Sequence, residues 1–181
     1  MKRFSVCLIG LLCLACLLIT MGFRINLTDS IPVGLYRIIH EGELKNAYVI
    51  FCPDNRSAFR LSLERGYIDH GLNCGGYGYL MKKVVAIPGD IVSVTKAGVL
   101  VNQAPIPFSK PKLKDGLNRP LPQWRVTHYQ LAKDELLTMT NQSEWSFDGR
   151  YYGLVRLSQI KGMLRPLWVI KKLEKNHDRY K

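Results

Sequence analysis

The chain begins with an apolar stretch that differs from everything after it. No charged residue occurs from Phe4 to Phe23. Twenty helical residues at about 1.5 Å each match the roughly 30 Å hydrocarbon core of a bilayer. Lys2 and Arg3 precede the run, and by the positive-inside bias they favour a cytoplasmic N-terminus. The pattern therefore predicts a transmembrane anchor over residues 1–23, with the remaining chain outside the cytoplasm.

Other interpretations of this segment fit less well. Thr20-Met21-Gly22 loosely resembles a signal-peptidase cleavage site, but the apolar run is longer than the usual signal core of about 7–15 residues. Ala15 before Cys16 is compatible with a lipoprotein signal. However, Cys13 is a poor residue three positions before the lipidated cysteine, and the apolar run continues past Cys16. A buried core helix is a weak alternative at this length and position. We therefore expect a retained anchor.

After the anchor, the apolar pattern shortens to strand-sized segments bounded by turn residues. One short helix is expected over Ser57–Arg65, where Gly66 provides a C-cap. The expected strands are Tyr48–Cys52, Tyr79–Ile87, a hairpin over Ile91–Val101 that turns at Ala97-Gly98, Gln130–Thr140, and one or two strands within Leu154–Ile170.

Three other segments read as irregular. Residues 26–36 form a tight segment, residues 104–122 hold five of the nine prolines and predict a loop, and a polar stretch covers 141–153. The fold class is therefore mainly β, with many short strands after one N-terminal helix. The expected parts are a cytoplasmic tip and anchor at 1–23, one extracytoplasmic domain at 24–170, and a basic tail at 171–181.

The charge balance narrows the choice of partner. The chain carries 26 Lys and Arg against 14 Asp and Glu, a formal charge of +12. Residues 1–23 contain two basic and no acidic residues, so the remaining chain keeps +10. Such a surplus favours either nucleic acid or an anionic membrane surface. A nucleic-acid partner conflicts with a membrane anchor, so we expect none. We expect instead that the positive charge, including Lys171 and Lys172, holds the domain on the anionic lipid surface.

The cysteines divide between the two parts of the chain. Two lie beyond the anchor, Cys52 and Cys74, 22 positions apart, and in an oxidising compartment they predict a disulfide. We expect no zinc site and no other cofactor, because two thiols without a histidine at ligand spacing are too few. The remaining cysteines, Cys7, Cys13 and Cys16, fall inside the apolar run, where thiols pack as small apolar groups.

The first candidate for chemistry is the segment T-D-S-I-P around Ser30. A serine in a constrained turn presents its hydroxyl as a nucleophile, although alone this pattern is more often a plain turn. The second is L-M-K-K-V-V-A-I-P-G-D, with Lys82 and Lys83 inside an apolar strand. Because side chains alternate across a strand, only one of the two lysines faces the core. A buried lysine with a lowered pKa serves as a neutral base, whereas an edge-strand pair of lysines only keeps the strand soluble.

The third candidate is S-F-D-G-R-Y-Y-G, which begins at Ser146. Asp148 and Arg150, two residues apart and flanked by glycine and aromatic residues, fit a structural ion pair in a turn. A simple hairpin turn is the alternative. Each of the three segments is weakly informative alone, and their order behind an N-terminal anchor is the more specific signal.

That ordered set resembles the type I signal peptidases, and most of all their conjugal-transfer branch, the TraF-type peptidases that process plasmid pilin subunits. The resemblance covers roughly residues 20–170. The family has a Ser-x-Pro motif, matched by Ser30 and Pro32. It also has a lysine six residues before the proline of a Pro-Gly-Asp turn, matched by Lys82 and Pro88. Its third motif is matched by Ser146, Asp148, Arg150, Tyr151 and Gly153; the Cys52 and Cys74 spacing and the ending R-P-L-W are typical of the branch.

The resemblance implies a signal-peptidase or LexA-like complex β fold and a Ser/Lys dyad without a cofactor. It implies Ser30 as nucleophile, Lys82 as general base, Thr28 as an oxyanion donor, and Ser146 as the residue that orients Lys82. Asp148 and Arg150 are implied as scaffold, and the aspartate has also been considered a third catalytic member in the branch. We expect Ile31, Pro32, Leu80 and Val84 to contact small substrate side chains.

The implied substrate is an exported precursor, most simply a conjugative pilin subunit, at the periplasmic side of the bacterial inner membrane. Departures from the housekeeping enzymes argue against a general secretory role: Ile31 replaces methionine after the serine, Gly149 follows Asp148 where serine is more usual, and the chain is short. A non-enzymatic assembly protein of the transfer apparatus and a general type I signal peptidase remain as alternatives. Substrate identity, and the choice between hydrolysis and cyclisation, stay open.

Overall fold

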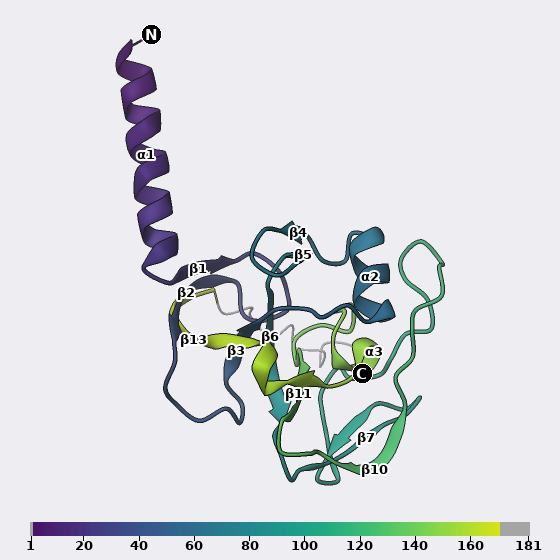
Figure 1. Ribbon diagram of the computed structural model, residues 1–181. Helices are drawn as coiled ribbons and strands as arrows, with labels where there is room; N and C mark the ends of the chain where they lie inside the picture. The colour runs from purple at the N-terminus through teal and green to yellow at the C-terminus, as the bar shows by residue number, and fades with distance from the viewer. Residues whose placement is uncertain (1, 171–181) are drawn as a thin grey trace, which may run out of the picture.

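The computed structural model describes residues 2–170, and Figure 1 shows one helix projecting from a β-rich body. Helix α1 covers Lys2–Thr20, and the large apolar side chains from Val6 to Ile19 are 40–69% exposed. The expected N-terminal helix is confirmed, with an earlier end: Gly22, at φ 85°, turns the chain and Phe23 enters a strand. Within the described residues, no helix combines the length and apolar character of a membrane span. The tail at 171–181 lies outside the described residues.

The main sheet has seven strands, and every pairing described within it is antiparallel. Strand β13 is the longest and pairs with both β2 and β3. Gly34 permits the close approach of β2 to β13, since a Cβ there would lie 2.2 Å from the carbonyl oxygen of Trp168. In spatial order the strands are β1 Phe23–Asn26, β2 Gly34–Ile39, β13 Ile160–Val169, β3 Tyr48–Phe51, β6 Leu80–Ala86, β11 Glu135–Met139 and β12 Val155–Arg156.

Two smaller sheets complete the β structure. The predicted hairpin over 91–101 is confirmed as β7 and β8, which form the centre of a four-stranded sheet. The order in this sheet is β10 Val126–Gln130, β7 Ile91–Val94, β8 Val99–Val101 and β9 Ala104–Pro105, and a two-stranded sheet pairs β4 His70–Gly71 with β5 Gly76–Tyr77.

The single strand predicted over Gln130–Thr140 is wrong. The chain forms β10 and β11 in different sheets, with a turn between Leu131 and Asp134. Glu135 stabilises this turn, because its carboxylate accepts a hydrogen bond from the Ala132 amide at 2.9 Å. A turn that is stabilised by a hydrogen bond to one polar side chain leaves no signal in the periodicity of apolar residues.

Three helical segments lie between the strands. Helix α2, Ser57–Glu64, confirms the predicted helix, and Gly66 follows it at φ 71°, the left-handed conformation expected after a helix end. Helix α3, Gly149–Tyr152, occupies the polar stretch that was expected to be irregular. A 3₁₀ helix, η1, covers Leu157–Gln159 and leads into β13.

The main core lies between the large sheet and helices α2 and α3. Phe51 of β3, Phe59 of α2 and Tyr152 of α3 meet there, with ring centroids 4.7 Å apart for Phe59 and Tyr152. These side chains are 0–4% exposed. Burial of large aromatic rings is the main force that holds the short helices against the sheet.

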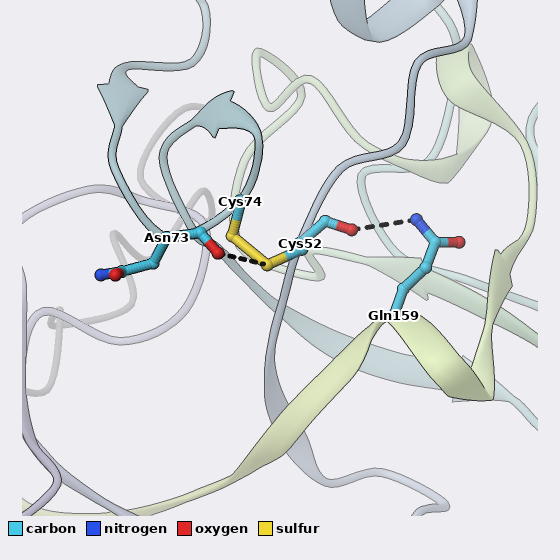
Figure 2. Close-up of a disulfide and its surroundings, with 4 residues drawn as sticks. All are labelled: Cys52, Asn73, Cys74 and Gln159. Atoms are coloured by element: carbon cyan, nitrogen blue, oxygen red, sulfur yellow. Dashed lines mark hydrogen bonds between the residues drawn. A yellow bond between two sulfur atoms is a disulfide. The ribbon is translucent and has the colours of Figure 1, made fainter.

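The predicted disulfide between Cys52 and Cys74 is present (Figure 2). It joins the end of β3 to the turn between β4 and β5, and its two Cα atoms lie 5.2 Å apart. Gln159 fixes the same segment from the other side, because its Nε2 donates to the Cys52 carbonyl oxygen at 2.9 Å. The bond therefore attaches an otherwise short hairpin to the main sheet.

Candidate active site

Ser30 lies in the loop between β1 and β2, and one buried side chain organises that loop. The Asn26 amide nitrogen donates to the carbonyl oxygens of Thr28, Ile31 and Pro32 at 2.7, 2.8 and 3.2 Å. Its amide oxygen accepts from the backbone N–H and the hydroxyl of Thr28, at 3.3 and 2.9 Å. Three carbonyl oxygens therefore converge on one amide, and this arrangement holds Ser30 at the turn.

Lys82 comes from β6 in the middle of the large sheet. It pairs with Val49 of β3, while its neighbour Lys83 pairs with Tyr48 and Met139. Lys82 is 2% exposed and Lys83 is half-buried, as strand alternation predicts. The sheet thus directs only Lys82 into the interior.

The structure brings Ser30, Lys82 and Ser146 together from segments far apart in the sequence. The Lys82 Nζ donates to the Ser30 Oγ at 2.7 Å and to the Ser146 Oγ at 2.6 Å. Both distances are short enough for direct proton transfer. A neutral amine between two hydroxyls can accept from one of them and donate to the other.

Burial determines the acidity of Lys82. Desolvation lowers its pKa from 10.5 to about 8, the Asp148 carboxylate opposes this shift, and the Arg150 guanidinium adds to it. The net effect places the neutral form of the amine within reach of moderately alkaline conditions. A lysine on the surface would be protonated there.

Asp148 and Arg150 form a fully buried ion pair, and both residues are 0% exposed. The guanidinium donates to the two carboxylate oxygens, each at 2.8 Å, and the Asp148 side chain also caps α3 by accepting from the Arg150 N–H. Arg150 further donates to the carbonyl oxygens of Phe108, at 2.7 Å, and Ser143, at 3.3 Å. The pair therefore holds the segment that carries Ser146.

Thr28 lies beside the Ser30 amide. The Ser30 N–H points to the Thr28 Oγ1 at 3.4 Å, and the Thr28 hydroxyl donates to Asn26. Two donors of the kind that stabilise an oxyanion are thus adjacent. For the Thr28 hydroxyl to serve an oxyanion, it must rotate away from the Asn26 oxygen.

A cleft of about 660 Å³ opens at Ser30 and Lys82. Its walls come from the Ser30 loop, the start of β6, the segment around Ser146 and the proline-rich loop. Of the four residues expected to contact substrate, only Leu80 lines the cleft. Ile31 and Val84 are 0% exposed in the core, and Pro32, half-buried, uses its carbonyl oxygen within the loop, so direct contact by these three is not supported. Other apolar residues on its walls include Leu27, Tyr79, Met81, Leu121, Trp145 and Phe147.

The proline-rich loop forms one wall because a single carboxylate stabilises it. Asp115 accepts from the backbone N–H of Leu117 at 2.9 Å and of Arg119 at 2.8 Å, and from the Tyr67 hydroxyl. Arg65 at the end of α2 donates to the Pro120 carbonyl oxygen at 2.7 Å. The segment predicted to be an irregular loop is therefore an ordered wall attached to α2.

Sequence reasoning missed two residues that the geometry brings into the site. Asn26 has no pattern that distinguishes it from other asparagines near turns, although its ability to bond nearby backbone groups is typical of the residue type. Thr140 was expected only as the end of a strand. Its hydroxyl reaches the carbonyl oxygen of Asp29 at 3.1 Å across 111 positions of sequence, a contact that only tertiary structure reveals.

Residues 1–168 match the family described as signal peptidase, peptidase S26. The chain belongs to this family. It is 47% identical over 146 residues to a plasmid transfer protein TraF from Escherichia coli, covering 81% of this chain and 82% of that protein. It is 35% identical to a probable conjugal transfer protein TraF from Sinorhizobium fredii, covering 78% and 74%.

Among solved structures, a signal peptidase I from Enterococcus faecalis gives a TM-score of 0.41 at 14% identity, over 70% of this chain and 100% of that chain. The family match and the TraF-named relatives confirm the resemblance that the ordered motifs indicate.

Proposed function

We propose that this S26 family member is a serine endopeptidase with Ser30 as nucleophile and Lys82 as general base. The observation that carries the proposal is the 2.7 Å contact between the Lys82 Nζ and the Ser30 Oγ in a site where Lys82 is 2% exposed. A serine hydroxyl needs a base to attack at neutral pH, and a desolvated amine is a competent base.

The reaction follows acyl-transfer chemistry. Neutral Lys82 takes the Ser30 proton as Oγ bonds to the scissile carbonyl carbon, whose oxygen becomes an oxyanion. The Ser30 N–H and the Thr28 hydroxyl stabilise that oxyanion. When the tetrahedral intermediate collapses, the C–N bond breaks and the Lys82 ammonium protonates the leaving amine. An ester on Ser30 remains, and Ser146 keeps Lys82 in position through its 2.6 Å contact.

Water or an amine then resolves the ester. With water, Lys82 removes a proton as the water oxygen attacks, and the product is a free carboxylate. If the precursor's own N-terminal amine attacks instead, a new peptide bond closes a ring. Both routes release Ser30 with its proton and need no cofactor.

The proposed substrate is a precursor exported by a conjugative transfer system, most simply its pilin subunit. The names of the relatives, which are plasmid and conjugal transfer proteins, support this choice. Disulfides persist in oxidising compartments, and the domain has one between Cys52 and Cys74. We therefore propose that the domain acts on the periplasmic side of the inner membrane.

The direct test is to incubate the full chain with the pilin precursor of the same transfer system and to weigh the product by mass spectrometry. Ser30→Ala and Lys82→Ala should each lower processing at least about 1000-fold, as loss of a nucleophile or its base does in other serine peptidases. Lys83→Ala, the matched control on the same strand, should process normally. Full transfer by cells carrying either inactive variant would favour an assembly role without catalysis.

The pH dependence of kcat/KM provides a second readout. Protonated lysine cannot accept the Ser30 proton, so the rate should rise with pH until it passes the pKa of about 8 that burial gives Lys82. A rate that is independent of pH between 6 and 9 would contradict lysine as the base.

A further inference from the structure

Thr140 connects the nucleophile loop to the interior of the domain. It is the first residue after β11, and it is 0% exposed. Its hydroxyl donates to the Asp29 carbonyl oxygen at 3.1 Å and accepts from the Gln142 N–H at 3.1 Å. Its backbone N–H donates to the Asp148 Oδ2 at 3.3 Å. One residue therefore touches both the Ser30 loop and the buried ion pair.

The Asp29 carbonyl oxygen is a special acceptor because it belongs to the same peptide unit as the Ser30 N–H. A trans peptide is planar, and its carbonyl oxygen and amide hydrogen point in opposite directions. A hydrogen bond that fixes the Asp29 oxygen therefore also fixes the direction of the Ser30 N–H. In the proposed mechanism, this N–H is one of the two groups that donate hydrogen bonds to the oxyanion.

The other contacts of Thr140 make it a firm support. The Asp148 carboxylate that receives its N–H is held by two bonds of 2.8 Å from Arg150. The residue before it, Met139, pairs with Lys83, the neighbour of Lys82 on β6. Thr140 is thus placed by the same strand pair that places the base.

Asn26 and Thr140 hold the loop in different ways. Asn26 is the last residue of β1, so its hydrogen bonds, all within residues 26–32, shape the loop and hold it to the edge of the sheet. The Thr140 hydroxyl supplies a second link, from the end of β11, the strand that pairs with β6, to the Asp29 carbonyl oxygen.

We infer that Thr140 is a positioning residue of the proposed peptidase, whose hydroxyl holds the Asp29–Ser30 peptide so that the Ser30 N–H faces the position beside the Thr28 hydroxyl where the oxyanion develops. In the structure this N–H donates to the Thr28 Oγ1 at 3.4 Å, and the oxyanion replaces that acceptor. The inference rests on the proposed function and deepens it. Thr140 touches no reacting atom, and its effect passes entirely through the peptide that it fixes.

The test compares Thr140→Val, which removes the hydroxyl and keeps the shape, with Thr140→Ser, which keeps the hydroxyl and removes the methyl group. The substrate is a soluble peptide that spans the pilin cleavage site. Loss of an oxyanion donor costs about 100–1000-fold in kcat, so misdirecting one should cost at least about tenfold. We expect this loss in kcat for Thr140→Val with KM within about twofold, and recovery to near the wild-type rate in Thr140→Ser.

A second measurement separates positioning from general structural damage. A peptide aldehyde adds to Ser30: Lys82 takes the Oγ proton as the Oγ bonds to the aldehyde carbon, and the electron pair of the carbonyl double bond moves to the oxygen, which enters the oxyanion site. The matching peptide alcohol fills the same cleft without forming that bond. Thr140→Val should weaken aldehyde binding about tenfold and leave alcohol binding unchanged, since only the adduct needs the Ser30 N–H.

Three results would overturn the inference: wild-type kcat in Thr140→Val, equal weakening of aldehyde and alcohol, or a Thr140→Ser variant as slow as Thr140→Val. If Thr140→Val does not fold, Thr140→Ala replaces it with the same expectations, and thermal unfolding checks each variant. Failure of the proposed function has a different signature, because wild type and Ser30→Ala would then treat the peptide alike.

Discussion

Ser30 and Lys82 meet at one point, but the two sides of the site are held by different means. The Ser30 loop, residues 27–33 between β1 and β2, is shaped by the Asn26 amide and linked to the sheet by the Thr140 hydroxyl. Lys82 lies inside the large sheet, near an ion pair that is 0% exposed. A hydroxyl nucleophile needs orientation and access, which a loop supplies, whereas an amine base needs desolvation, which only packing supplies.

The different support of the two sides predicts that substitutions on each side affect stability and activity differently. Changes on the base side should alter both stability and activity, because the packing that tunes Lys82 also holds the core. Changes on the nucleophile side should lower activity more than stability. The following variants test that division, from the largest expected change in the free energy of unfolding to the smallest.

Asp148→Ala should cause the largest loss. It leaves the Arg150 guanidinium buried without its partner, and breaking a buried pair on one side costs about 3–5 kcal/mol. Denaturant unfolding measures the loss. Asp134→Ala is the matched control, because it breaks an ion pair on the surface, in which the Asp134 side chain is 51% exposed and the Arg156 side chain is 62% exposed. Loss of an exposed pair should change stability little. Similar small losses in both variants would contradict a packed base side.

Removing the disulfide with Cys52→Ser and Cys74→Ser should cost about 3 kcal/mol, the loop-closure entropy expected for a sequence separation of 22. The bond attaches the β4–β5 hairpin, which lies between the cleft-lining segments 67–69 and 79–82, and touches neither Ser30 nor Lys82. Peptide cleavage at low temperature should therefore survive. Abolished cleavage in a variant that is still folded would place this hairpin within the site.

Lys82→Met should change the pH dependence of stability. The folded-state pKa of about 8 lies below the ordinary 10.5, so in the wild type the buried ammonium costs stability below pH 8, and this cost disappears as pH rises to 10.5. A shift of this size corresponds to roughly 3 kcal/mol at most. The stability of Lys82→Met relative to wild type should therefore be most favourable below pH 8 and fall steadily to pH 10.5. A relative stability that stays constant over this range would show that Lys82 is not desolvated.

Asn26→Ala should give the smallest loss of stability, about 1–3 kcal/mol for carbonyl groups that lose their donor. Its activity should fall more than tenfold, because the loop no longer presents Ser30 and Thr28 in fixed positions. Asn26→Asp is the sharper variant: it keeps an acceptor for Thr28 but faces the carbonyl oxygens with a carboxylate, and it should be at least as inactive. A stability loss larger than that of Asp148→Ala would reverse the comparison between the two sides.

The sequence was most informative where chemistry and local pattern coincide. Strand alternation predicted that only one of Lys82 and Lys83 faces the core, because the two faces of a strand have opposite environments, and the spacing to Pro88 in the family motif selected Lys82. The short helix over 57–65, the hairpin over 91–101 and the Cys52–Cys74 bond were also predictable, since glycine turns and an even pair of exported cysteines are local or compositional signals. Ordered motifs identified the family for the same reason.

Prediction failed where contacts cross long stretches of chain. The split of 130–140 into β10 and β11, the burial of Ile31 and Val84 away from the cleft, and the end of α1 at Thr20 depend on which surfaces meet. Each reflects a choice that local apolarity leaves open.

The sequence by itself determined which residues have the chemistry to act: a serine in a turn, a lysine in an apolar strand, and an Asp–Arg pair near a second serine. Only the tertiary structure decided that Ser30 and Ser146 both lie within 2.7 Å of the Lys82 Nζ, and that Thr140 reaches the Asp29 carbonyl oxygen. The physical reason is that a hydroxyl, an amine or a carbonyl oxygen has its reactivity set by neighbours at hydrogen-bond distance and by exclusion of water. These neighbours are separated by 52 to 111 positions along the chain, so only packing of the sheet brings them together.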